Sequence, residues 1–171
     1  MATSELLLFD TDRVDPAANA PGVTTSASAA AATTNTFQTR FRTLDLDQTT
    51  DEATSYQFRM PSNYLSGGTV VIQWIATPTT NNVVFKVAAF VSTDGSTDID
   101  TNGAFGTPTL SSVTPVPGTS GHTKTTSIAM TSPGFAAGRL TILMVGRDAD
   151  HASDNAAGDI RILSVTLQYT S

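Results

Sequence analysis

This chain has 171 residues and no cysteine, so its length favours a single domain and excludes both a disulfide framework and a thiolate metal site. Its formal net charge is -6, with only nine Lys and Arg residues, which disfavours nucleic acids as partners because binding them depends on neutralising phosphates. An anionic membrane surface is disfavoured for the same reason. No stretch approaches the roughly 18 apolar residues of a membrane-spanning helix.

Residues 1–35 are predicted to form an N-terminal arm followed by a low-complexity linker. The apolar run from Leu6 to Phe9 is too short for a secretion signal, and Glu5 stands where such a signal carries positive charge. Leu6, Leu7, Leu8 and Phe9 should nevertheless be buried, because large apolar side chains gain free energy on leaving water. Three partners remain open for them: a second copy of the chain, another protein, or the edge of the chain's own sheet.

Residues 36–171 are predicted to form a β-sandwich domain, because short strand-like segments alternate with Gly, Pro and Asn turns. With seven or eight strands and no convincing helix, the pattern favours an antiparallel jelly roll. The expected strands, in chain order, are Phe37 to Thr43, Thr54 to Met60, Thr69 to Ala76, Val83 to Val91, a weak pair within Thr107 to Val116, His122 to Thr131, Arg139 to Arg147 and Asp159 to Tyr169.

Several of these segments alternate with a period of two, which indicates one buried and one wet face. The residues expected to share a buried face are Thr54, Tyr56, Phe58 and Met60; Val83, Phe85, Val87, Ala89 and Val91; and Leu163, Val165, Leu167 and Tyr169. Two other segments, Val70 to Ala76 and Leu140 to Val145, are apolar on both faces. We expect Trp74 in the core, with Val71 and Ile75 on an outer face that forms an interface. Cyclic symmetry would close it, so a homotrimer is predicted.

Two patterns raise the question of catalysis or metal binding. Ser153, His151 and Asp148 could be arranged as a catalytic triad, but no nucleophile elbow accompanies them, and we predict no catalytic residue. The acidic loop from Asp94 to Asp100 lacks the ligand order of a calcium loop, although Asp148, Asp150, Asp154 and Asp159 could add ligands if the two loops met. Polar turns are the favoured interpretation, with no metal and no cofactor.

Arg147 and Asp148 follow the apolar strand at its end. The pair either fixes a loop within the chain or makes a contact between subunits. The second interpretation places both residues with the candidate partner contacts Leu6, Leu7, Leu8, Phe9, Val71 and Ile75.

Three segments, taken in order, carry a resemblance to a known family. The first is Phe58-Arg-Met-Pro-Ser-Asn-Tyr64 followed by Gly67-Gly68, and the second is the Trp74 strand with the strand from Val83 to Phe90. The third runs from Leu143 to Ala149, through Asp154, to Gly158–Val165 and Gln168-Tyr169. Over residues 37–171 this order resembles jelly-roll structural proteins of tailed bacteriophages, whose members sit on heads or tails, often as trimers.

The resemblance implies a virion component. The expected function is decoration or cementing of the phage capsid, with the chain itself (as a homotrimer) and the major capsid protein or another virion protein as partners. The alternatives are a tail-fibre or tail-tip module and a receptor-binding module that recognises carbohydrate; an enzyme is the least favoured. The expected location is the outer surface of the capsid, or else the tail, after synthesis in the host cytoplasm.

Overall fold

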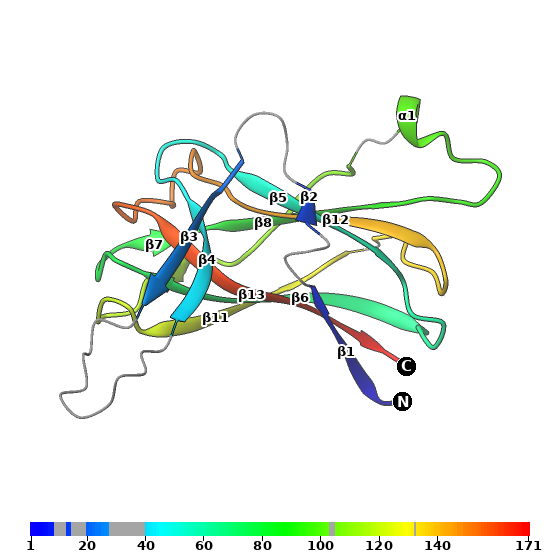
Figure 1. The fold of residues 1–171 in the computed structure, drawn as a ribbon, viewed down its shortest axis with the longest axis horizontal. Helices are drawn as coiled ribbons and strands as arrows, with labels where there is room; N and C mark the ends of the chain where they lie inside the picture. The colour runs from blue at the N-terminus through cyan, green and yellow to red at the C-terminus, as the bar shows by residue number, and fades with distance from the viewer. Residues whose placement is uncertain (9–12, 15–19, 28–39, 103–104, 132) are drawn as a thin grey trace.

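The computed structural model describes the whole chain except residues 9–12, 15–19, 28–39, 103–104 and 132. Its strands form two layers that face each other (Figure 1). The predicted class, an all-β antiparallel jelly-roll sandwich, is confirmed. One helical turn, α1 (Ile99–Asn102), stands outside the layers at one end. No helix in the described part of the chain is both long and apolar enough to cross a membrane.

The first layer, sheet A, has six strands. β1 (Thr3–Leu8) pairs with β13, outside the order β11-β6-β13-β4-β3. The other bounds are β11 (Thr123–Ala129), β6 (Ser66–Ala76), β13 (Ile160–Thr170), β4 (Arg40–Leu46) and β3 (Gly22–Ala27). β4 pairs with Ile160–Ile162 and β1 pairs with Val165–Thr170, so these two strands share one edge of β13 end to end.

The second layer, sheet B, has the order β2-β5-β12-β8-β9, and every pairing is antiparallel. Its bounds are β2 (Arg13–Val14), β5 (Ala53–Arg59), β12 (Leu140–Arg147), β8 (Phe85–Val91) and β9 (Thr109–Leu110). Two short strands, β7 (Asn82–Val83) and β10 (Thr114–Pro115), form a separate ladder. The weak strands expected between residues 107 and 116 are therefore real but only two residues long.

The core lies between the inner faces of the two sheets, as the alternating pattern predicts. Trp74 is 0% exposed, and its ring meets that of Phe85 edge-on at 5.4 Å. Trp74 Nε1 donates a hydrogen bond to Thr126 Oγ1 at 2.9 Å, so the one polar group of this side chain is satisfied inside the core. The tryptophan joins the two sheets, and its predicted core position is confirmed.

The buried face predicted for the last strand is wrong at one residue, Leu163. The pairing of β13 with β6 shifts register between Ile162 and Ser164. A bulge of this kind adds a residue to one strand, so Leu163 leaves the inner face, on which Val165 and the later residues of the predicted set remain buried. The bulge coincides with the junction where β4 ends and β1 begins along β13.

The N-terminal segment lies along the sheet of its own chain, one of the three arrangements left open by the sequence. In β1, Leu8 is only 6% exposed and Leu6 packs against the core, whereas Leu7 is 46% exposed. Phe9 lies outside the described residues. The two chain ends meet, because Ala2 and Ser171 exchange backbone hydrogen bonds of 3.2 and 3.0 Å. The division of the chain at residue 35 into an arm with its linker and a sandwich domain stays a prediction, although β1 and β3 both belong to sheet A.

Candidate functional site

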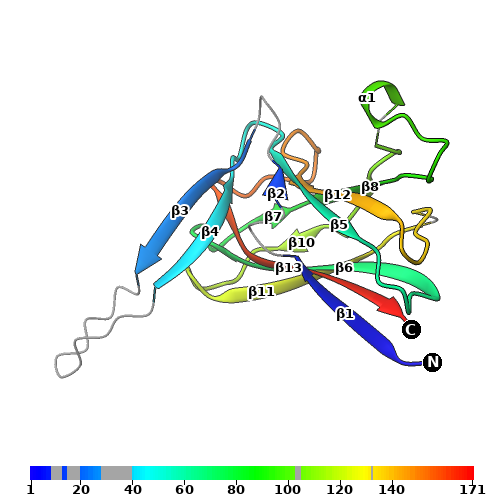
Figure 2. The same ribbon diagram turned by 45° about the vertical axis from the view of Figure 1, so that its right-hand side comes forward.

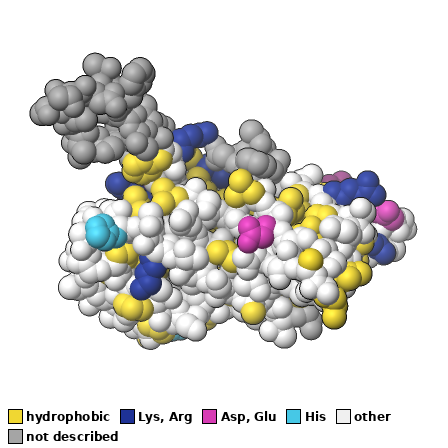
Figure 3. Space-filling view, turned by 90° about the horizontal axis from the view of Figure 1, so that it is seen from below, with side chains coloured by type: hydrophobic (Ala, Val, Ile, Leu, Met, Phe, Trp, Pro, Cys, Tyr) yellow, Lys and Arg dark blue, Asp and Glu magenta, His cyan; other side chains and the backbone are white. Residues whose placement is uncertain are grey.

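The outer face of sheet A is rich in uncharged hydrogen-bonding side chains. Residues paired across strands point to the same side of a sheet, which brings together rows of outward residues. These rows are Thr125, Gln73 and Ser164; Ser127, Val71, Thr166 and Leu7; and Ala129, Thr69, Gln168 and Glu5. Figure 3 looks onto this face from below, and most of it is white, with few charged side chains.

An apolar groove opens at one end of this face. Its lining comes from four regions: Phe41 of β4, Ile75 of β6, Leu163 of β13, and Gly121 with Thr123 at the start of β11; its volume is about 220 Å³. We call it the Phe41 groove. Ile75 is 7% exposed although it points away from the core, so it forms part of the groove floor. β3 and β4 slope away from the rest of the sheet beside it (Figure 2).

A charged pair lies next to the groove. Arg161 is the register partner of Ile75, and its Nε lies 3.8 Å from Asp45 Oδ2, with no hydrogen-bond partner of its own. Asp45 Oδ1 also accepts a hydrogen bond of 2.6 Å from Thr43 Oγ1. The opposite charges offset each other, and together they offer hydrogen-bond donors and acceptors at the rim of an apolar surface.

Arg147, which was considered together with Asp148 as a partner contact, is a core residue of this chain. Its side chain is 0% exposed and pairs with Asp154, 1% exposed, at 2.7 Å from Nη2 to Oδ1. The guanidinium also donates to the carbonyl oxygens of Ala156 at 2.8 Å and Gly158 at 2.9 Å. Arg147 therefore fixes a loop, but its ionic partner is Asp154 and not the expected Asp148, because the turn after β12 brings Asp154 back over the guanidinium. A side chain enclosed in this way is not available on the surface of the chain.

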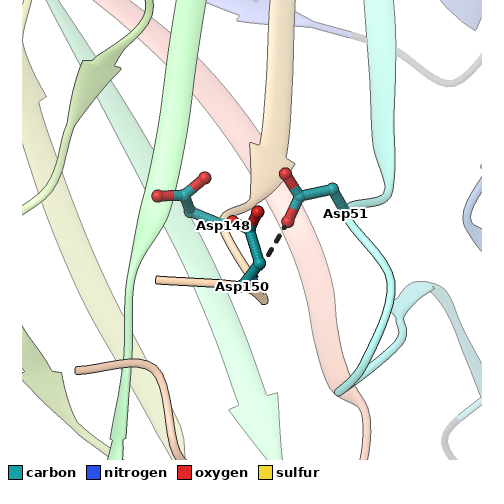
Figure 4. Close-up of side chains that lie close together, drawn as sticks. All are labelled: Asp51, Asp148 and Asp150. Carbon is teal, nitrogen blue, oxygen red and sulfur yellow. Dashed lines mark hydrogen bonds between the residues drawn. The ribbon is translucent and has the colours of Figure 1, made fainter. Parts of the chain in front are cut away.

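Asp148 belongs instead to an acidic corner with Asp51 and Asp150 (Figure 4), where one oxygen from each carboxylate lies within 4.8 Å of the others. Lys86 Nζ contacts Asp51 and lies 3.1 Å from Asp148 Oδ1. Burial raises the pKa of Asp51, but the bonds from Lys86 and from the backbone N–H of Ala149 outweigh it and hold this pKa below its ordinary value. The ammonium group thus supplies the positive charge at this corner.

The Asp94–Asp100 loop lies at the other end of the sandwich from the loop after β12 (Figure 1). The two loops therefore do not combine into one ligand set. Asp98 Oδ1 accepts the N–H of Asp100 at 3.1 Å, an arrangement of a local turn. Asp51 was missed as a member of an acidic group, because it comes from a loop that is distant in the sequence.

The suggested triad does not assemble. His151 Nδ1 accepts the backbone N–H of Ser153 at 3.1 Å, so that nitrogen stabilises a turn and makes no hydrogen bond with the serine hydroxyl. Asp148 is directed to Lys86. The geometry gives nucleophilic catalysis no support at this place.

Two predicted partner contacts, Leu7 and Val71, are brought together on the outer face of sheet A. Thr166 pairs with Leu7 on one side and Val71 on the other. Ile75 lies on the same face, in the groove, and whether any of these residues contacts a partner stays a prediction. Phe41 and Arg161 were missed as site residues. The period-two pattern from Phe37 to Thr43 did place Phe41 on a strand, but not beside Leu163.

No protein-family model matches the chain, and no curated protein matches it. Among solved structures, the chain is similar to a CBM35 from Cellvibrio japonicus, with a TM-score of 0.50 and 14% identity over 96% of this chain and 92% of that one. It is also similar to a family 11 carbohydrate-binding module from Clostridium thermocellum in complex with a β-1,3-1,4-mixed-linked tetrasaccharide, with a TM-score of 0.51 and 12% identity over 98% and 96% of the chains.

A third similar structure contains the CBM22-1 and GH10 modules of a Clostridium thermocellum xylanase complexed with xylohexaose. Its TM-score is 0.50 and its identity 13%, over 96% of this chain and 27% of that one. At these identities the likeness shows the jelly-roll fold alone. The resemblance to phage structural proteins stays a prediction.

Proposed function

We propose that this chain is a non-catalytic module that binds carbohydrate on the outer face of sheet A. The observation that carries the proposal is the Phe41 groove. A sugar ring has an apolar C–H face and hydroxyl groups around its rim, so it fits an apolar floor surrounded by hydrogen-bonding groups. Phe41, Ile75 and Leu163 offer that floor, and Arg161 with Asp45 offers donors and acceptors beside it.

The composition of the surrounding face supports the same ligand class. Its outward rows consist mainly of Thr, Ser and Gln side chains, which can both donate to and accept from hydroxyl groups. The shared fold is further support, since two of the similar solved structures hold a mixed-linked tetrasaccharide and xylohexaose. Carbohydrate binding was the alternative to capsid decoration in the sequence analysis, and the groove favours it.

Isothermal titration calorimetry with the mixed-linked tetrasaccharide and with xylohexaose, preceded by a glycan array, tests the proposal. We expect binding by the parent chain and a loss of at least about fivefold in affinity for Phe41→Ala, since stacking on an aromatic ring contributes about 1–3 kcal/mol in the related case of nucleic acid bases. Phe105→Ala is the matched control, because Phe105 is an exposed phenylalanine outside the groove. The proposal is wrong if no glycan on the array binds, or if both variants bind like the parent.

Attachment to a virion as a homotrimer is a second candidate function, and the outer face of sheet B favours it. Leu140, Ile142 and Met144 are half-buried and alternate with the core residues Leu143 and Val145. Ile142 lies between Gln57 and Phe90 in register, and Met144 between Ser55 and Ala88. An apolar row of this kind suits an interface. Partners on the particle and the virion location are proposed on the resemblance of the sequence to phage structural proteins, and a head-decoration and a tail role differ in copy number per particle.

A further inference from the structure

A second hollow lies at the far end of the face that carries the Phe41 groove. Gly67, Gly68 and Thr69 of β6 and Gln168 and Thr170 of β13 line it, and its volume is about 260 Å³. We call it the distal hollow. The same two strands supply Ile75 and Leu163 to the groove. The two depressions are therefore the ends of one strip that runs lengthwise along β6 and β13.

The register of the two strands gives the length of this strip. Thr69 pairs with Gln168 at the distal hollow, and Ile75 pairs with Arg161 at the groove. Six residue steps of about 3.3 Å separate the two rows along β6, a span of about 20 Å. A single sugar ring fills only one depression, whereas a chain of several sugar units is needed to reach both.

The side chains between the two ends are suited to hydroxyl groups. The rows are Gln73 with Ser164 and Val71 with Thr166, so three of the four side chains carry a hydroxyl or amide. Charged groups near the strip are already engaged. Arg161 faces Asp45 at the groove, and Glu5 Oε1 accepts a hydrogen bond of 2.7 Å from Gln168 Nε2 near the hollow. Gln168 is neutral, so Glu5 keeps its negative charge, whereas Arg161 is offset by Asp45. The described part of the strip therefore disfavours an anionic ligand.

An added protein strand is a poor occupant of this strip. β6 is bonded to β11 and β13, and β13 is bonded to β6 and to β1 or β4. A peptide that binds by strand addition needs free backbone groups at a sheet edge, and the strip presents side chains on a face. A ligand of this strip therefore contacts side chains and not free backbone groups, and the apolar floor and the polar rows suit ring faces and hydroxyl groups.

We propose that the ligand is an unbranched, uncharged polysaccharide that lies lengthwise along β6 and β13, from the Phe41 groove to the distal hollow. The inference rests on the proposed function and adds the ligand's length, charge and direction. One sugar ring packs on Phe41, Ile75 and Leu163, the following units bond the Thr, Ser and Gln rows, and the far end of the chain lies in the distal hollow.

Calorimetry with a chain-length series tests the inference. The probes are xylose, xylobiose, xylotetraose and xylohexaose, the matching mixed-linked glucans, and an oligogalacturonide as a charged chain. We expect affinity to rise from the disaccharide to the tetrasaccharide or hexasaccharide, and the charged chain to bind at least about tenfold more weakly. Thr69→Tyr fills the distal hollow, so it should reduce hexasaccharide affinity by at least about tenfold and leave disaccharide affinity unchanged.

Gln57→Tyr is the control for the added ring, because Gln57 is exposed on β5, in sheet B on the other side of the sandwich. Circular dichroism and thermal melting establish that each variant is folded. If sugars bind and Phe41→Ala abolishes binding, but chain length and Thr69→Tyr have no effect, the lengthwise site is refuted while the proposed function stands. If none of the sugars binds to the parent chain, the proposed function fails as well.

Discussion

Replacing Arg147 with alanine should strongly destabilise this protein. The guanidinium is fully buried, and it is the ionic partner of Asp154, whose side chain is 1% exposed. Its removal leaves a buried carboxylate without its cation and deprives the carbonyl oxygens of Ala156 and Gly158 of a donor. Breaking a buried ion pair by deleting one partner costs about 3–5 kcal/mol. For a chain of this length each kcal/mol lowers the Tm by about 2–4 °C, so we expect a drop of about 6–20 °C.

Thermal and urea denaturation followed by circular dichroism measure this change. Arg59→Ala is the matched control, because Arg59 is exposed and donates a hydrogen bond of 2.7 Å from Nε to the Gly138 carbonyl oxygen. This substitution should lower the free energy of unfolding by about 1 kcal/mol or less. Asp154→Ala should lower the Tm as much as Arg147→Ala, since it leaves the buried guanidinium without its carboxylate partner. It also removes the acceptor for the Val84 N–H, at 2.9 Å.

The double variant isolates the coupling of the pair. Its loss of stability should be smaller than the sum of the two single losses, because neither charge is left alone in the core. A Tm of Arg147→Ala within about 2 °C of the parent, a shift that corresponds to about 1 kcal/mol or less, would show that water or a rearranged loop replaces the guanidinium and that the reasoning is wrong.

Four further predictions concern other parts of the fold. Leu8→Ala should lower the free energy of unfolding measured in urea by about 2–5 kcal/mol, whereas Leu7→Ala, at an exposed residue, should leave it almost unchanged. Equal losses for the two variants would contradict the pairing of β1 within this chain. The depressed pKa of Asp51 means that its stabilisation is present above its unfolded pKa and is lost as pH falls through the lower folded value. Asp51→Asn should therefore lower the Tm at pH 7 and have a smaller effect in acid below about pH 4; a constant difference would argue against it. EDTA, with or without added calcium, should leave the Tm unchanged because Lys86 supplies the charge at the acidic corner, and a reversible drop would reveal a metal site. Light scattering should show a trimer that Met144→Glu dissociates, whereas a monomeric parent at micromolar concentration would rule the trimer out.

Local sequence pattern was sufficient for most of the architecture. A period of two in Thr54 to Met60 and in Val83 to Val91 identifies the inner face of each strand, because a strand against a core must alternate. The core position of Trp74 followed from its apolar neighbours. The same rule failed at Leu163, where one extra residue reverses the alternation. Nothing in the composition of Ile162-Leu163-Ser164 marks that bulge, which arises where two different strands, β4 and β1, succeed each other along one edge of β13.

Tertiary structure alone decided which distant residues meet. Arg147 stands next to Asp148 in the sequence, yet it bonds Asp154, because the strand directs successive side chains to opposite faces and only the returning loop reaches the inner one. The Phe41 groove is assembled from four strands of sheet A, and its contributions from different strands are separated by tens of residues in the sequence. Periodicity reports which way a side chain points from its own strand. The strand order, which depends on packing across the whole sandwich, determines what that side chain faces.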